Sequence, residues 1–445
     1  MRRSALRSTF GILLFGVSLQ LYSQALAITV TNLNDSGPGS LRQAIADAPA
    51  GGTIDFAVTG TIVLTSGQLV FTNDLTVNGP GATNLTVSQN LGDRILEVSN
   101  GDVTISGLAI ANGRPLGNYE DGGGIKNLAA LTLRNCLVAS NYANRNGGGI
   151  YNEGTLIVQD SLIKSNTAGV LGGGIANFYG GATTIVGSTI CSNNADIFHG
   201  WVAGGGIHTG SNRYLVVSNS TVSGNQWYGI MSYGGGGETV LISSSTLANN
   251  QQGDMGTEGG HAVIRNSIIK ACGGFFTSED YNLIQSTEFS TFITGATNHN
   301  IYGLDPKLGP LADNGGPTPT HALRFDSPAI DAGQSGGVIT DQRGLPRPID
   351  GPNIPNADGG DGCDIGAYEA DPIVKVTGFE AAGAQVRVGF DSVLGRSYRL
   401  ESKTNLENSW TTNSDNIPGT GSANQTVNAG TANLPRQFYR VKLLP

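Results

Sequence analysis

The sequence predicts an all-β protein whose main body is a parallel β-helix, a solenoid in which every coil adds one strand to each of several sheets. Three segments that begin with Gly-Gly-Gly-Ile, at Gly122, Gly147 and Gly172, share one pattern with a period of 25 residues. Such a period indicates stacked units, none of which can bury its apolar face alone. Apolar residues alternate within each unit, as Leu156 and Val158 do, which is the two-residue period of a strand. Three short strands per repeat, separated by Gly, Asn and Ser, predict a triangular coil.

The spacing also predicts a ladder of asparagine side chains along the stack. With Ser161 as an anchor, the equivalent positions in the other coils are Gly107, Cys136, Ser188, Ser220, Ser245 and Ser267. Five residues after these anchors lie Asn112, Asn141, Asn166, Asn193, Asn225 and Asn250, and Cys272 takes this place in the last coil. At the strand spacing of about 4.8 Å, each amide can donate to an acceptor in the next coil. The GGGI runs predict a second asparagine column and an adjoining interior column, formed by Asn127, Asn152 and Asn177 and by Ile125, Ile150, Ile175 and Ile207.

Residues 1–27 have the features of an export signal. Arg2, Arg3 and Arg7 precede a short apolar stretch, and Ala25-Leu26-Ala27 is a small-residue cleavage site. The stretch is too short for a permanent membrane span, although an uncleaved anchor is the alternative. Removal of the three arginines changes the net charge from −9 to −12. This acidic net charge argues against a nucleic-acid partner. No transmembrane segment is predicted in the mature chain.

The composition agrees with a solenoid. Glycine supplies 67 of the 445 residues, and charged residues make up 13% of the chain against an ordinary share of about 25%. Many tight corners and few charges favour a β-helix over a helical enzyme.

A short helix is predicted over residues 41–48, at the start of the mature chain. Ser40 can cap it, and Leu41, Ala44, Ile45 and Ala48 recur at helical spacing. An amphipathic helix is expected there because the open end of a solenoid exposes apolar interior and unpaired strand edges. The segment TNLNDSGPGSLRQAI resembles the N-terminal module of bacterial surface β-helix proteins of the CSLREA type, with an ordinary first turn as the alternative. The first strands are expected at residues 54–56, 62–64, 75–77, 85–87, 95–98 and 103–105.

The GGGI and SxIxxN patterns resemble the GGAI and FxxN repeats of polymorphic outer-membrane proteins and related right-handed β-helix proteins. This resemblance covers residues 28–285 and implies a right-handed coil, in agreement with the general rule for parallel crossovers. It is informative about fold and carries little about activity.

Residues 286–371 change pattern and resemble the choice-of-anchor Q module of secreted bacterial proteins. The resemblance is carried by SPAIDAG from Ser327, DQRG from Asp341, Arg347-Pro348 and DIGAYE from Asp364. Because Pro cannot donate to another strand, this segment is expected to terminate the stack. The expected end-closing ion pairs involve Asp341, Arg343, Arg347, Asp364 and Glu369, and the alternative is calcium bound by Asp350, Asp358, Asp361 and Asp364. A Cys272–Cys363 disulfide is compatible with export, but nothing in the sequence requires it.

Residues 372–445 alternate in the manner of strands with turn signals between them. They predict a small antiparallel β-sandwich of the immunoglobulin or fibronectin kind. The YRLE, W and FYRV segments resemble a C-terminal module of exported bacterial proteins.

Two groups of residues are candidate sites. In the longer coils, Trp201, Trp227, Tyr228 and Tyr233 are candidates for carbohydrate binding, since aromatic rings suit sugar faces, and the alternative is that they clamp the loop onto the stack. Asp254, Glu258 and His261 are candidates for catalysis, and the alternative is a solvated Gly-rich turn. A polysaccharide-active β-helix enzyme needs paired carboxylates or a calcium site, and the repeats show no acidic column.

The sequence therefore predicts a right-handed parallel β-helix protein that is exported to the outer cell surface or the medium. The expected role is non-enzymatic adhesion, scaffolding or glycan binding, with glycans or cell-surface components as partners and no cofactor beyond an optional Ca²⁺. The alternative is a lyase, hydrolase or epimerase that acts on a polysaccharide on a pectate-lyase-like β-helix.

Overall fold

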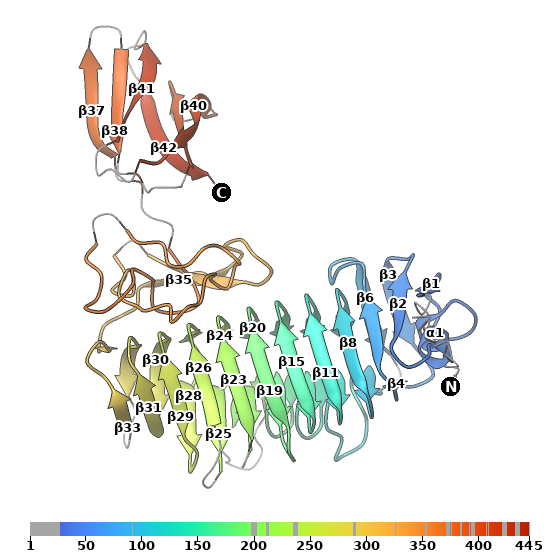
Figure 1. Cartoon of the computed structure of the whole chain (residues 1–445). Helices are drawn as coiled ribbons and strands as arrows, with labels where there is room; N and C mark the ends of the chain where they lie inside the picture. Colours follow the sequence, from blue (N-terminus) through green and yellow to red (C-terminus); the bar gives the residue numbers. More distant parts are fainter. Residues whose placement is uncertain are drawn as a thin grey trace, which may run out of the picture.

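The structure, a computed structural model, is a rod of stacked coils with an irregular module on its flank and a small β-domain beyond it (Figure 1). It describes residues 27–445 with the exception of residues 91, 197–202, 211–212, 235–238, 288–290, 325, 352–353, 371–373, 375, 383–384, 391, 393–396, 406, 408, 421–424, 432–436 and 445. The predicted signal peptide, residues 1–27, lies outside the described residues except for Ala27.

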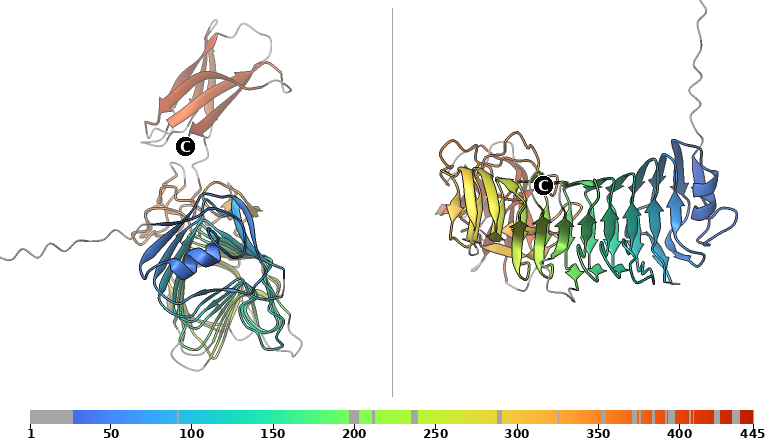
Figure 2. Two further views of the ribbon diagram at one scale, coloured as in Figure 1. Left: turned by 90° about the vertical axis from the view of Figure 1, so that its right-hand side faces the viewer. Right: turned by 90° about the horizontal axis from the view of Figure 1, so that it is seen from below.

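The predicted right-handed parallel β-helix is confirmed. Its strands form three parallel ladders, here called faces A, B and C, which surround one core (Figure 2).

Face A contains β1 Ile28–Val30, β2 Gly52–Phe56, β5 Leu75–Asn78, β8 Asp102–Ser106, β11 Ala130–Arg134, β15 Thr155–Gln159, β19 Ala182–Val186, β23 Tyr214–Ser218, β26 Thr239–Ser243, β29 Ala262–Arg265, β31 Phe275–Glu279 and β33 Phe292–Ala296.

Face B contains β3 Gly60–Leu64, β6 Leu85–Gln89, β9 Ala109–Ala111, β12 Leu137–Ala139, β16 Leu162–Lys164, β20 Thr189–Cys191, β24 Thr221–Ser223, β27 Thr246–Ala248, β30 Ile268–Gly273, β32 Leu283–Thr287 and β34 Ile301–Tyr302.

Face C contains β4 Leu69–Phe71, β7 Leu96–Val98, β10 Ile125–Asn127, β14 Ile150–Asn152, β18 Ile175–Asn177, β22 Gly204–Thr209, β25 Tyr228–Tyr233 and β28 Gly253–Glu258. A small fourth ladder holds β13 Tyr142–Ala143, β17 Thr167–Ala168 and β21 Asn194–Ala195.

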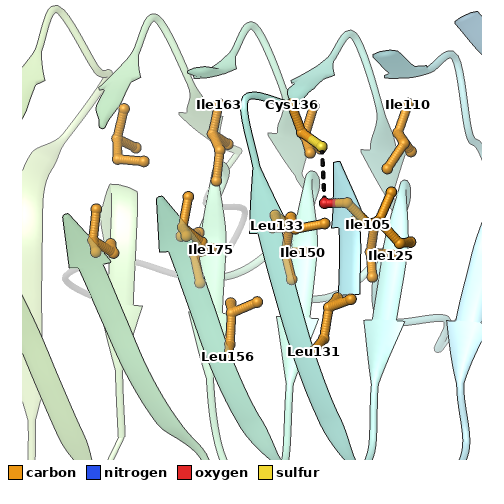
Figure 3. Close-up of a cluster of buried hydrophobic side chains, with 14 of the residues drawn as sticks. Ile105, Ile110, Ile125, Leu131, Leu133, Cys136, Ile150, Leu156, Ile163 and Ile175 are labelled. Atoms are coloured by element: carbon orange, nitrogen blue, oxygen red, sulfur yellow. Dashed lines mark hydrogen bonds between the residues drawn. The ribbon is translucent and has the colours of Figure 1, made fainter. Parts of the chain in front are cut away.

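In the core, residues of the same type stack on one another from coil to coil. Ile125 pairs with Ile150, and Ile150 pairs with Ile175, as the interior isoleucine column predicts. Leu131 and Leu156 lie opposite them on face A, and all five side chains are buried (Figure 3). Each coil alone would expose these groups to water, so burial of apolar surface between coils holds the rod together.

The predicted asparagine ladder forms from Asn141 to Asn250. The Nδ2 atom of each asparagine donates to the Oδ1 atom of the next, at 2.9 Å for Asn141 to Asn166, 3.0 Å for Asn166 to Asn193 and 3.0 Å for Asn193 to Asn225. The bond from Asn225 to Asn250 is 2.8 Å long. The same oxygens also accept from backbone N–H groups, so the ladder satisfies a buried corner of every coil.

The prediction for Asn112 is wrong. The register of β9 with β12 places Gly113 opposite Asn141, and the backbone N–H of Gly113 donates to Asn141 Oδ1 at 2.8 Å. Asn112 precedes that position with a left-handed φ of 63°, and its Nδ2 donates to Ser88 Oγ. The error arose because Leu108, and not Gly107, is the equivalent of Cys136.

The ladder explains why the third glycine of each GGGI run is required. A Cβ atom on Gly174 would lie 3.0 Å from Asn193 Nδ2 and 2.6 Å from the carbonyl oxygen of Gly206. The amide and the neighbouring backbone thus occupy the volume of a side chain. Glycine on face C and asparagine at the next corner are two parts of one packing arrangement.

Two further polar columns run beside the ladder. The Oγ atoms of Ser161, Ser188, Ser220, Ser245 and Ser267 each accept a backbone N–H of the preceding coil, at 3.0 to 3.2 Å. In the second asparagine column, Asn127 donates to Asn152 at 2.7 Å and Asn152 donates to Asn177 at 2.9 Å. Each column satisfies buried backbone groups at a corner.

The predicted N-terminal helix is confirmed as α1, Leu41–Asp47, across the first coils (Figure 2). Ser40 Oγ accepts the backbone N–H of Gln43 at 3.2 Å, which is an N-cap bond. Leu41 and Ala44 are buried in the core cluster of the rod. The helix therefore covers the N-terminal end of the stack.

The sequence predicted that the segment after β34 closes the other end of the rod. This prediction is wrong, because the segment returns along the flank of the rod. It contains β35 Leu308–Ala312 and β36 Thr320–Leu323, and is otherwise irregular. Outward threonines of face B bind it: Thr189 Oγ1 donates to the carbonyl oxygen of Pro319, and Thr246 Oγ1 accepts the N–H of Ala367. We call residues 305–370 the flanking module. In the same outward column of face B, Ile268 and Leu283 follow these threonines and form a buried apolar cluster with Ala329 and Ile365 of the module.

The five predicted end-closing residues are buried inside the flanking module. Arg343 Nε pairs with Asp341 Oδ2 at 2.7 Å, and Arg347 Nε pairs with Glu369 Oε2 at 2.8 Å. Asp364 Oδ1 accepts the N–H of Asp331, and the N–H of Asp364 itself donates to Glu369 Oε2. Burial raises the pKa of Asp364 well above its ordinary value, and the neighbouring Glu369 charge raises it further. These ion pairs fix the fold of the module, and they are not at the end of the rod.

The C-terminal residues form two three-stranded antiparallel sheets, as the sandwich prediction requires. One sheet holds β37 Val376–Ala382, β38 Gln385–Phe390 and β41 Gln425–Thr431, and the other holds β39 Ser397–Lys403, β40 Thr411–Pro418 and β42 Phe438–Leu444. Val388, Phe390, Tyr398 and Leu400 are buried between them.

Candidate functional site

A polar pocket of about 420 Å³ lies where the flanking module meets the rod, and we call it the junction pocket. The rod contributes the turn residues between faces A and B, and the module contributes the opposite wall. The lining residues are Asn135, Gln159, Asp160, Val186, Gly187 and Asn219 from the rod and Pro317 and residues 340–344 from the module.

The local conformation of the turn places polar residues in this pocket. Asn135, Asp160 and Asn219 have left-handed φ values of 50°, 49° and 50°, and Gly187 at the same place has 61°. Gly adopts this conformation readily because it has no Cβ atom, and Asn and Asp do so more often than other residues because their short polar side chains bond locally to the backbone. The signal in the sequence is the residue before each anchor, which is Asn135, Asp160, Gly187, Asn219 and Asn266, with Ser244 as the exception. The prediction of candidate sites did not use it.

The module wall is fixed by hydrogen bonds to the rod. Gln342 Nε2 donates to Thr189 Oγ1 at 2.8 Å, and Gln342 Oε1 accepts from Thr221 Oγ1 at 2.6 Å. Asp341 accepts from the backbone N–H and Nε of Arg343, and from the N–H groups of Leu345 and Glu369. The carboxylate of Asp341 is therefore fully occupied and serves as structure.

Asp160 and Asn219 are two polar groups of the rod in this pocket, and the unpaired oxygen of Asn219 is buried away from solvent. Asp160 Oδ2 accepts Gln159 Nε2 at 3.2 Å, and burial raises the pKa of the Asp160 carboxyl above its ordinary value. Asn219 Nδ2 donates to the carbonyl oxygen of Thr340, and Asn219 Oδ1 has no donor among the described residues. The pocket offers amides and a carboxyl group that can exchange hydrogen bonds with a hydroxyl-rich ligand.

The three predicted catalytic residues do not come together. Asp254 and Glu258 lie at opposite ends of β28, about 13 Å apart at the rise of a strand. His261 is exposed, and its Nε2 lies 2.7 Å from Thr277 Oγ1 on the outside of face A.

Asp254 instead ends the asparagine ladder. Its Oδ1 accepts both Asn250 Nδ2 at 2.8 Å and the backbone N–H of Asn250, and its Oδ2 accepts the N–H of Ala271 at 2.8 Å. Asp254 stands opposite Gly229, whereas Cys272 pairs with Met255 in the interior column of face C, so the predicted place of Cys272 in the ladder is wrong. In this last coil the carboxylate thus replaces the missing amide. Burial raises the pKa of Asp254 to about 6.

The predicted aromatic site is not a single patch. Trp201 lies outside the described residues. Trp227 and Tyr228 are at the beginning of β25 and Tyr233 is at its end, about 17 Å away at the rise of a strand. The structure therefore separates the described candidates.

A different group of rings packs on the outside of face C. Phe178 stacks between Tyr151 and His208, with ring centroids 6.1 Å and 5.6 Å apart. The middle coil carries the small Ala176 at the outward position, so Phe178 from the following turn fills the space. Tyr151 and His208 are both buried.

The buried His208 is expected to make the rod sensitive to acid. Burial lowers the pKa of His208 to about 4, below the ordinary value of 6.5. The neutral ring thus contributes about 3 kcal/mol to the free energy of unfolding, and this contribution is complete above about pH 6.5. It is lost as the pH falls through about 4. The next coil has methionine, Met231, at the position equivalent to His208. The stability of the variant His208→Met is expected to lack this part of the pH dependence. Urea unfolding at several pH values measures it, and identical pH profiles for both proteins would contradict the prediction.

Two of the four predicted calcium ligands, Asp350, Asp358, Asp361 and Asp364, already bind protein groups. Asp361 accepts the N–H and Oγ of Ser335, and Asp364 accepts the N–H groups of Asp331 and Ala370. Among the described residues, no group of three or more His, Cys, Asp or Glu side chains is arranged to hold a metal ion. All four cysteines are free and buried, so Cys272 and Cys363 do not form the disulfide that the sequence allowed.

Comparison with known proteins supports the fold. Residues 205–302 match the family model described as a right handed beta helix region. The match begins in β22 and ends in β34. A search of curated proteins returned no match. No helix in the described part of the chain has both the length and the apolar character to cross a membrane.

Proposed function

We propose that this chain is an exported cell-surface or secreted β-helix protein that binds a glycan in the junction pocket without turning it over. The observation that carries the proposal is a pocket lined by the amide of Gln159 and the carboxyl of Asp160, which is built jointly by the stack and the flanking module. Export is proposed from the basic and apolar residues of 1–27 and from the resemblance to surface β-helix proteins.

The size and chemistry of the pocket favour a neutral sugar. A volume of about 420 Å³ is within the range of small-ligand sites. Arg343 is engaged by Asp341 and lies over the ring of Tyr368 at 3.7 Å, so its charge is already compensated. Sugar hydroxyl groups both donate and accept, and can therefore pair with the carboxyl of Asp160 and the amide of Gln159.

Catalysis on a polysaccharide finds less support in this pocket. Hydrolysis of a glycosidic bond uses two carboxyl groups on either side of the bond. The pocket contains Asp160 and Asp341, and the carboxylate of Asp341 accepts from Nε of Arg343 and from the backbone N–H groups of Arg343, Leu345 and Glu369. One available carboxyl group can bind a sugar, but it does not supply both roles.

A glycan array together with a panel of polysaccharides tests this proposal. We expect binding of a neutral oligosaccharide with no release of reducing ends or unsaturated products, because Asp160 lacks a carboxylate partner. Gln159→Ala and Asp160→Asn are each expected to weaken binding about tenfold or more, which corresponds to the loss of one or two buried hydrogen bonds.

The matched control is Glu279→Ala. Glu279 occupies the same outward column of face A as Gln159 but lies several coils away, so its removal is expected to leave binding unchanged. Failure of the array to show any bound glycan, or products whose release stops in Asp160→Asn, would overturn the proposal.

A further inference from the structure

The C-terminal sandwich differs in charge from the rest of the chain. Residues 372–445 contain eight Lys and Arg against five Asp and Glu, which gives a net charge of +3. Residues 28–371 contain 14 Lys and Arg against 29 Asp and Glu, which gives a net charge of −15. A basic domain attracts anionic partners that an acidic surface repels. The distribution of charge therefore indicates the sandwich as the part of the protein that can bind a polyanion.

One sheet of the sandwich carries four cations on its outer side, which we call the basic face. The residues of β39 that alternate with the buried Tyr398 and Leu400 point outward, and so do their partners on β42. The outward cations are Arg399 and Lys403 on β39 and Arg440 and Lys442 on β42.

Arg440 is held in position by contacts within the sandwich. Its Nε donates to Glu401 Oε2 at 2.6 Å, and Glu401 is itself buried. The guanidinium also lies over the ring of Trp410, with Cζ 4.3 Å from the ring centroid. Neither Nη group of Arg440 donates to a described residue. A planar guanidinium whose N–H groups point outward matches the two oxygens of a carboxylate.

Two lysines extend the basic face around Arg440. The Nζ atom of Lys403 lies 4.6 Å from the centroid of the same Trp410 ring. Lys442 is exposed and follows Arg440 by two residues on the same side of β42, about 7 Å along the strand. No ion pair of Lys442 is found in the described part of the chain. The three cations therefore form a row that a chain of anionic groups can follow.

We infer that the basic face binds an acidic polysaccharide whose sugars carry carboxylate groups. The carboxylates meet Arg440 and the two lysines, and sugar hydroxyl groups can bond to Thr412, which is exposed opposite Glu401 on β40. Arg399 is engaged by both oxygens of Asp415, at 2.9 Å and 2.8 Å, so few cations of the face remain uncompensated. A few separated charges suit a polymer with one charge per sugar better than nucleic acid, whose binding uses many phosphate contacts.

Titration calorimetry of residues 28–445 with sodium alginate, a polymer of uronic acids, tests this inference. We expect binding that weakens about tenfold or more when the NaCl concentration rises from about 50 mM to about 500 mM, because salt screens the attraction. Arg440→Gln and Lys442→Gln are each expected to weaken binding about tenfold, which corresponds to the loss of one charge-assisted hydrogen bond. Lys442 has no ion pair to lose within the described residues, so its variant reports on binding even if Arg440→Gln disturbs the fold.

The matched control is Arg387→Gln. Arg387 is exposed on β38 between the buried Val386 and Val388, so it lies on the outer side of the other sheet. The substitution removes the same charge from the same domain, and it is expected to leave alginate binding unchanged.

Other probes separate the basic face from general anion binding and from the junction pocket. Polyphosphate, single-stranded DNA and phosphatidylglycerol vesicles are anionic but lack carboxylated sugars, and we expect each to bind more weakly than alginate. Asp160→Asn is expected to leave alginate binding unchanged, because the junction pocket is a separate site. Absence of alginate binding at about 50 mM NaCl, an equal loss in Arg387→Gln, or tighter binding of one of the other three anions would each overturn the inference.

Discussion

Replacement of Asn166 by alanine is expected to lower the free energy of unfolding by about 4 kcal/mol. Asn166 Oδ1 accepts two donors of Asn141, and Asn166 Nδ2 donates to the carbonyl oxygen of Val138 at 3.0 Å and to Asn193 Oδ1. All these groups are buried, and a buried donor without an acceptor costs about 1–3 kcal/mol. Urea unfolding followed by circular dichroism measures the loss.

The control for this change is Asn144→Ala. Asn144 follows the same turn of the preceding coil and donates one exposed bond, to the carbonyl oxygen of Gly117. Its loss is expected to change stability by no more than about 0.5 kcal/mol. Equal effects of the two substitutions would show that the ladder contributes no special stability.

Replacement of Asp254 by alanine is expected to destabilise the rod by about 3 kcal/mol, because three N–H donors from Asn250 and Ala271 lose their acceptor. The expected effect is on folding, since the carboxylate is enclosed at the end of the ladder and does not face Glu258 or His261. Thermal and urea unfolding measure it, and an unchanged transition would contradict the structural role.

The titration of Asp254 provides an independent test of its burial. Its folded pKa of about 6 is above the ordinary value of 3.8 because burial disfavours the charge. The neutral carboxyl thus contributes stability that is complete below about pH 3.8 and is lost as the pH rises through about 6. Asp254→Asn cannot titrate, so its stability is expected to lack this decline between pH 4 and 7. Parallel profiles of the unfolding free energy against pH for the two proteins would show that the Asp254 carboxyl is in contact with water. That result would contradict its burial.

The periodic part of the fold could be predicted from the sequence because every coil must bury the same apolar positions and satisfy the same polar corner. Isoleucine at 125, 150 and 175 must face one core, and asparagine at 141, 166 and 193 must satisfy one corner. The cap at Ser40 followed from local helix chemistry, which requires no knowledge of distant contacts.

The remaining errors involve contacts between distant segments. Thr189 and Thr221 look like ordinary surface residues until Pro319 and Gln342, more than 100 residues later, bind them and position the flanking module. Asp254 was a catalytic candidate because Glu258 and His261 follow it closely in the sequence, but its partners are an amide and a backbone N–H from different coils. The junction pocket combines both kinds of segment, so no local pattern revealed it.

The pairing of glycine on face C with asparagine at the next corner has a consequence for evolution. Every coil from Gly147 to Asn225 offers its neighbours the same donors, acceptors and empty volume, so a whole repeat can be duplicated or removed without leaving a mismatched seam. Asp254 ends the ladder, because its carboxylate accepts the bonds that the amide of a further asparagine would accept. The rod can therefore change length by internal duplication while its two ends stay the same.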